Sequence, residues 1–96
     1  MKKPETKFKE KILSRLKELP NSWVVKVQQV ALRGTPDILL CLKGHFVAIE
    51  LKTEDGELDA LQTYNIEQIV KAGGSAYVMT PDNCFGILLE LKDLAR

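Results

Sequence analysis

Residues 34–52, GTPDILLCLKGHFVAIELK, place two strongly apolar runs on either side of a Lys-Gly pair. Ile38 to Leu42 and Phe46 to Leu51 lack the alternation of polar and apolar residues that marks a strand with one face in water. We therefore expect the two runs to form a β-hairpin in the middle of a sheet, with helices covering each side. This expectation limits the chain to folds with a buried central hairpin.

The segments around the hairpin carry their own helix and strand patterns. Apolar residues spaced three or four apart predict helices over about 5–19 and 57–72, and a last helix that begins after Asp82 or Asn83. β-branched residues predict strands over 23–30 and 75–79. The expected order is αβββαβα. The apolar side chains expected to point inward from the second helix are Leu58, Leu61, Ile66, Ile69 and Val70.

Three charged residues interrupt the apolar hairpin, namely Asp37, Glu50 and Lys52. If Lys43-Gly44 forms a two-residue turn, Asp37 pairs with Glu50, and their Cβ atoms lie roughly 4.5–5.5 Å apart on one face of the sheet. Lys52 follows Glu50 by two residues and lies on that same face. A three-residue loop would shift the pairing by one residue but would keep the three groups close.

Two opposed carboxylates in an apolar setting repel each other and are poorly solvated. A hard divalent cation such as Mg²⁺ or Mn²⁺ would compensate, because these ions prefer oxygen ligands. The alternative is an ion pair between Asp37 and Lys52 that leaves Glu50 in solvent.

The tripeptides Thr-Pro-Asp and Glu-Leu-Lys each occur a second time, at 80–82 and 90–92, where they fall at or within a predicted helix. Their acids would lie about 12 Å apart along the helix axis and could not share an ion.

The Gly-x-Pro-Asp and Glu-x-Lys motifs on adjacent strands resemble the VRR-NUC (virus-type replication-repair nuclease) branch of the PD-(D/E)XK nuclease superfamily. Thr35 stands where an aliphatic residue is common in that branch. The resemblance implies a restriction-endonuclease-like α/β fold: an αβββαβ core with a mixed central sheet flanked by helices, plus a C-terminal helix, in a single domain of residues 1–96. The similar segments cover nearly the whole chain and read KPETKFKEKIL, RGTPDILL, HFVAIELKTEDGEL and LQTYNIEQIVKAGGSAYVMT.

The resemblance also implies metal-dependent hydrolysis of DNA phosphodiester bonds. Asp37, Glu50 and the backbone carbonyl of Leu51 would bind Mg²⁺ or Mn²⁺. Lys52 would orient or deprotonate the attacking water and stabilise the charge that develops on the phosphoryl group.

Two further residues are expected at the site. Glu5 lies on the inward edge of the first helix and is the expected third acid, although a carboxylate there would also stabilise a helix N-terminus. Gln62 is a polar residue within an apolar stripe, which is costly unless its amide has partners. In the family the equivalent glutamine is an active-site residue, and the alternative is a structural amide with satisfied hydrogen bonds.

The uneven charge along the chain is compatible with a nucleic-acid partner. The net charge is only +1, but residues 1–20 hold seven Lys and Arg residues against three Glu residues. A solvated surface helix would show the same pattern. If the partner is DNA, the expected contacts to its phosphates are Lys2, Lys3, Lys7, Lys9, Lys11, Gln28 and Arg33.

Stand-alone members of this branch resemble Holliday-junction resolvases in needing two active sites to cut opposed strands. We therefore expect a C2 homodimer that acts on branched or junction DNA. The alternatives are a flap or nicking nuclease of phage or bacterial replication and repair, and a non-catalytic DNA-binding module on the same fold.

No apolar stretch of the sequence is long enough to cross a bilayer. Cys41 and Cys84 are expected to be buried free thiols. A cytoplasmic location, in a bacterium or a phage-infected host, is expected.

Overall fold

The computed structural model describes residues 3–28, 32–53 and 57–96 of the chain. The observed order of elements is the predicted αβββαβα. The strand predicted over 23–30 ends earlier, at Lys26, and residues 29 and 30 lie outside the described residues. The elements are α1 (Pro4–Lys17), β1 (Ser22–Lys26), β2 (Ile38–Leu42), β3 (His45–Leu51), α2 (Ala60–Lys71), β4 (Ser75–Met79) and α3 (Cys84–Ala95).

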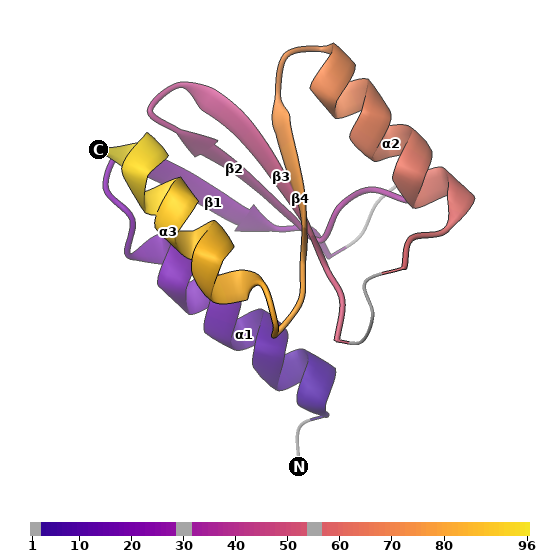
Figure 1. Cartoon of the computed structure of the whole chain (residues 1–96), viewed down its shortest axis with the longest axis horizontal. Coiled ribbons are helices and arrows are strands. Elements are labelled where there is room, and N and C mark those ends of the chain that lie inside the picture. The colour runs from indigo at the N-terminus through magenta and orange to yellow at the C-terminus, as the bar shows by residue number, and fades with distance from the viewer. Residues whose placement is uncertain (1–2, 29–31, 54–56) are drawn as a thin grey trace.

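The described strands form one mixed sheet in the order β1-β2-β3-β4 (Figure 1). β1, β2 and β3 are antiparallel neighbours, and β4 runs parallel to β3. The hairpin turn has the predicted length, because Leu42 faces His45 and Ile38 faces Ile49. Lys43 and Gly44 have φ angles of 50° and 86°. Two positive φ values suit the turn that matches the twist of a hairpin, so the local turn sets the register of the central strands.

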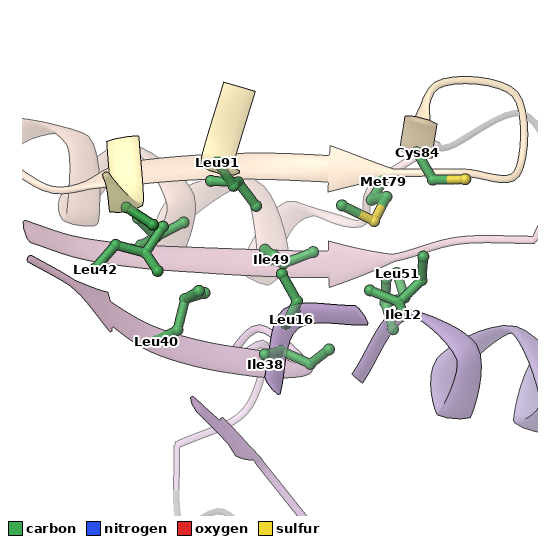
Figure 2. Close-up of a cluster of buried hydrophobic side chains, with 12 residues drawn as sticks. Ile12, Leu16, Ile38, Leu40, Leu42, Ile49, Leu51, Met79, Cys84 and Leu91 are labelled. Carbon is green, nitrogen blue, oxygen red and sulfur yellow. The ribbon is translucent and has the colours of Figure 1, made fainter. Parts of the chain in front are cut away.

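The hydrophobic core lies between one face of the sheet and the helices α1 and α3, which lie side by side (Figure 1). Alternate residues of β2 and β3, including Leu40 and Ile49, point into this layer. Ile12 and Leu16 of α1 and Leu91 of α3 meet them (Figure 2). Burying one such side chain contributes roughly 1.5–3 kcal/mol to stability. This layer therefore fixes α1 relative to the central hairpin.

The second helix, α2, packs against β4, and three of the five side chains predicted to point inward from this segment are partly buried. Leu61 and Val70 are 48% and 55% exposed, so their assignment to the inward stripe was wrong. Asn65 is only 9% exposed, and Gln62 is partly buried. The helix turns these two amides inward because both find hydrogen-bond partners there.

The opposite face of the sheet remains open over β1 and β2. Trp23, Cys41 and Phe46 are cross-strand neighbours on this face, and we call them the apolar row. Trp23 is 67% exposed and Phe46 is 43% exposed. Cys41 is a free thiol as expected, but it is exposed, so the prediction that it is buried was wrong; Cys84 is free and buried. No helix in the described part of the chain has the length and hydrophobicity to cross a lipid bilayer.

Candidate active site

Asp37, Glu50 and Lys52 meet in one cavity at the end of the central hairpin. Asp37 directly precedes β2, and the register that joins Ile38 to Ile49 continues to place Asp37 opposite Glu50. The backbone N–H of Leu51 donates to Asp37 Oδ2 at 2.8 Å. The cavity has a volume of about 240 Å³. Its lining comes from Asp37, Glu50, Leu51, Lys52 and Thr53 on the sheet side and from Glu5, Phe8 and Lys9 on α1.

Glu50 is buried beside a second acid. Its residue surface is only 5% exposed, so the alternative that leaves this carboxyl group in solvent was wrong. Burial, the charge of Asp37 and a hydrogen bond with Asp37 raise the pKa of Glu50 to about 8, against the opposing charges of Lys52 and Lys9. Near neutral pH and without a bound cation, Glu50 therefore keeps its proton.

Asp37 pairs with a lysine that the sequence did not single out for this role. Lys9 Nζ lies 3.4 Å from Asp37 Oδ1. The ion pair expected under the alternative interpretation, between Asp37 and Lys52, is not formed. Lys9 was predicted as a phosphate contact, and the structure places it in the cavity wall instead of on a fully solvated helix surface.

Gln62 connects the lysine and the buried acid. Lys52 Nζ donates to Gln62 Oε1 at 3.1 Å, and Gln62 Nε2 donates to Glu50 Oε2 at 3.1 Å. These contacts fix which end of the amide is oxygen, because only the oxygen can accept from an ammonium group. Gln62 therefore touches two of the predicted site residues, and it is also a structural amide with its hydrogen bonds satisfied.

The start of α2 holds this amide in place. Asp59 Oδ1 accepts from the backbone N–H of Gln62 at 2.8 Å, and Gln62 Oε1 accepts from the backbone N–H of Asp59 at 3.1 Å. This is a capping box, in which the helix N-terminus satisfies its own free N–H groups. Asp59 was not predicted as a site residue, although the Asp-x-x-Gln spacing is a sequence signal for a capping box.

Asn65, which was also not predicted as a site residue, connects α2 to the loop that precedes Asp37. Asn65 Nδ2 donates to the backbone carbonyl of Arg33 at 2.9 Å. Gly34 follows with a φ of +81°, and a Cβ atom built on it would lie 2.8 Å from the backbone carbon of Leu61. The loop that leads to Asp37 therefore touches the helix that carries Gln62. No simple sequence signal marks Asn65, because a lone amide in a helix is more often exposed.

Glu5 lines the same cavity from the first turn of α1, although its residue surface is exposed. Within the described residues, no three or more His, Cys, Asp or Glu side chains are grouped closely enough to hold a metal ion. The role of Glu5 as a third acid thus stays a prediction. Asp37, Glu50 and the Leu51 carbonyl offer only oxygen donors, which fits Mg²⁺ or Mn²⁺, since Mg²⁺ usually keeps several waters and takes one or two carboxylates.

The predicted phosphate contacts are spread over different surfaces. Lys3, Lys7, Gln28 and Arg33 are exposed, and Lys2 lies outside the described residues. Lys11 is exposed as well, but it lines a groove between α1 and α3, whereas Lys9 lines the cavity beside Asp37. The basic strip expected along α1 is therefore divided between two sides of the helix. Contact of these residues with DNA stays a prediction.

Comparison with models of known protein families and with curated protein sequences gave no match for this chain. The interpretation of the site therefore depends on its own geometry and on the motif resemblance. Two carboxyl groups, one of them protonated near neutral pH, meet an ammonium group in a water-accessible cavity, and the Gln62 amide connects this ammonium group to Glu50. Such a set of groups suits cation binding followed by attack of water on an anionic substrate.

The raised pKa of Glu50 predicts a specific pH dependence of stability. Between its ordinary pKa of 4.5 and the folded value of about 8, the folded protein keeps a proton that the unfolded chain loses. Without divalent cations, the free energy of unfolding should therefore fall as the pH rises from 5 to 8, with a slope contribution of at most about 1.4 kcal/mol per pH unit. Glu50→Gln should remove this contribution and be the more stable protein at pH 8. Urea unfolding followed by circular dichroism in EDTA measures both effects.

The matched control for this measurement is Glu67→Gln, because Glu67 is an exposed acid on α2. It should keep the pH profile of the parent. An unchanged profile in Glu50→Gln would show that the Glu50 carboxyl group is not the source of the slope.

Proposed function

We propose that this chain is a Mg²⁺- or Mn²⁺-dependent endodeoxyribonuclease of the VRR-NUC type, with a restriction-endonuclease-like fold. The observation that carries the proposal is the convergence of Asp37, Glu50 and Lys52 in one cavity. The αβββαβ order and the mixed sheet with a central antiparallel hairpin support the fold assignment. The second copies of Thr-Pro-Asp, at 80–82, and of Glu-Leu-Lys, at 90–92, lie in a turn and in α3, where they form no such site.

The proposed roles follow from the contacts of each residue. Asp37, Glu50 and the Leu51 carbonyl would hold the cation, which when bound would neutralise phosphate charge and lower the pKa of a bound water. Lys52 is held beside Glu50 through Gln62, and its backbone N–H donates to Met79 at 2.9 Å. Its ammonium group is thus positioned to orient the water or to stabilise negative charge as the phosphodiester is attacked.

The charges around the cavity suit a phosphate backbone. Lys9 and Lys52 contribute two ammonium groups to its wall. The N-terminal half of α1 borders the cavity, and the exposed Lys3 and Lys7 belong to this part of the chain. Lysines placed in this way would bind DNA phosphates without reading base sequence, so substrate choice would depend on DNA shape.

We also propose a C2 homodimer in which the apolar row forms the interface. An isologous interface must be complementary to itself, and an uncharged apolar patch meets this requirement. Trp23 and Phe46 are cross-strand partners of Cys41 from either side and are strongly exposed for aromatic residues. The row is on the face of the sheet that also bears Glu50, because Phe46, Ala48 and Glu50 alternate along β3.

Trp23→Ser is expected to convert the dimer into a monomer, since truncating a central aromatic residue of an interface commonly costs more than 2 kcal/mol. Size-exclusion chromatography with light scattering at micromolar concentration measures the change. The thermal unfolding midpoint extrapolated to low protein concentration should be nearly unchanged, because Trp23 is already exposed in the single chain. A parent protein that is monomeric on DNA would remove the homodimer from the proposal.

The function is tested by a cleavage panel on four-way junctions, flaps, linear duplexes and supercoiled plasmid, each with Mg²⁺, Mn²⁺ or EDTA. We expect cleavage of the junction with either cation and none with EDTA. Cleavage of flaps but not junctions would favour the flap nuclease. DNA binding without nicking of the plasmid in any metal would overturn catalysis and leave the DNA-binding module.

A further inference from the structure

A second and larger cavity lies between α1 and α3, on the face of these helices turned away from the sheet. Its volume is about 580 Å³, and it shares no lining residue with the candidate active site. The helices that form it lie side by side in Figure 1. We call this cavity the helix groove. Nothing in the proposed nuclease reaction uses it.

One wall of the helix groove is apolar and open to solvent. Phe85 and Leu89 lie four residues apart on α3 and are 74% and 51% exposed. Leu88 lines the groove beside them and is partly buried. The other side of α3, at Leu91 and Ala95, is fully buried in the core. α3 is thus apolar on both sides, and an exposed apolar patch of this kind marks an interaction surface.

The rim of the helix groove is mainly positive. Lys11, Arg15 and Lys92 line it against a single acid, Glu18. The ion pairs found among the described residues join Lys9 to Asp37 and Arg96 to Asp93, so the three cations of the rim have no acidic partner there. Lys11, Arg15 and Glu18 follow one another at four and three residues along α1 and its C-cap, which makes them one ridge beside the groove.

We propose that the helix groove binds an acidic amphipathic helix of another protein. Its apolar side chains would pack against Phe85, Leu88 and Leu89, and its carboxylates would face Lys11 and Arg15. The α1 ridge from residue 11 to residue 18 is about 11 Å long, which matches two turns of a bound helix. Amphipathic helices commonly bind in such grooves through residues spaced three and four apart.

Charge argues against two other occupants of the helix groove. A second copy of this chain, paired about a two-fold axis, would bring the cations Lys11, Arg15 and Lys92 of both copies together, and like charges across an interface cost affinity. DNA would be attracted by these cations but would offer no surface for the exposed Phe85 and Leu89. An acidic helix satisfies both the apolar wall and the positive rim. This proposal does not depend on the nuclease assignment.

The test uses the full chain and a fluorescent synthetic peptide of about 14 residues, with Leu at positions spaced three and four apart and Glu elsewhere. A matched peptide has Lys in place of every Glu. Anisotropy titrations should show saturable binding of the acidic peptide only, and added salt should weaken it. Phe85→Ser and Arg15→Glu should each weaken binding at least about tenfold, since aromatic and arginine residues dominate such interfaces.

Both substitutions are at exposed positions, so circular dichroism should show an unchanged fold. Val70→Ser and Lys71→Glu on α2 make the same kinds of change outside the groove and should leave binding unchanged. Trp23→Ser should also bind the peptide normally, whereas Phe85→Ser should leave the oligomeric state of the parent unchanged.

Four results of the binding experiments would overturn the proposal. These are the absence of saturable binding, equal binding of the basic peptide, unchanged affinity in Phe85→Ser, and stronger binding to vesicles of anionic phospholipid than to the acidic peptide. Loss of self-association in Phe85→Ser would also overturn it, because a second copy would then occupy the groove.

Discussion

Asp37→Ala and Lys52→Ala are each expected to lower the rate of DNA cleavage by about 10²–10³-fold or more, because under the proposed mechanism each removes a group that would act on the reacting phosphate. Asp37 is the acid nearest to Lys9 and to the Leu51 N–H, and its loss removes one of the two carboxylates available to a cation. Lys52 supplies an ammonium group beside Glu50 through Gln62. Single-turnover cleavage of a labelled junction at saturating enzyme measures the chemical step separately from binding.

The chain contains its own matched control for these two changes. The tripeptides that contain Asp37 and Lys52 occur a second time, at 80–82 and 90–92. In these second copies Asp82 lies in a turn and Lys92 lies on α3. Asp82→Ala and Lys92→Ala should therefore cleave DNA at the rate of the parent. All four variants should bind DNA and unfold cooperatively. Full activity in both Asp37→Ala and Lys52→Ala would contradict the proposed mechanism.

The local part of the site could be predicted because it depends on short-range rules. A two-residue turn with positive φ at Lys43 and Gly44 sets the pairing of β2 and β3, and the alternation of side chains then places Asp37 opposite Glu50. No knowledge of the rest of the molecule is required. For the same reason, the order of helices and strands followed from periodicity alone.

The predictions that were wrong or missing depend on how separate helices and strands pack against one another. Periodicity predicted a helix over 57–72, which the structure has at 60–71, but it assumed that every apolar residue of the stripe faces the core, so Leu61 and Val70 were placed inward. In the structure Leu61 and Val70 are exposed, whereas Asn65, for which no inward position was predicted, donates to the Arg33 carbonyl. Arg33 lies 32 residues from Asn65 along the chain, beyond any pattern that a local window can detect.

The ion pair of Lys9 with Asp37 also could not be predicted from local sequence patterns. As one of several lysines on α1, Lys9 carries no mark in the sequence that separates it from Lys7 or Lys11. Its ion pair with Asp37 follows from the direction in which α1 crosses the end of the hairpin, and this direction is set by the packing of Ile12 and Leu16 in the core. Side-chain partners across layers thus follow from tertiary packing.

Gly34→Ala is expected to be the most disruptive small change in the chain. Gly34 has a φ of +81°, and a Cβ atom would lie 2.8 Å from the Leu61 backbone and 2.9 Å from Asn65 Nδ2. The backbone strain costs about 1–2 kcal/mol, and overpacking against a helix costs about 1–3 kcal/mol more. α2 would have to move, and Gln62 would move with it away from Glu50. We therefore expect lower stability together with slower cleavage.

Gly44→Ala separates the two causes of this effect. Gly44 has a φ of +86°, but a Cβ atom there would meet nothing within 4 Å. Gly44→Ala should lower the free energy of unfolding only by the backbone strain of about 1–2 kcal/mol. Cleavage by the folded protein should be unchanged, because the turn is at the far end of the hairpin from Asp37. Urea unfolding gives the two losses of stability, and cleavage assays at a temperature where both variants are folded give the activities. If Gly34→Ala behaved like Gly44→Ala in both measurements, the contact between the loop and α2 would not position Gln62.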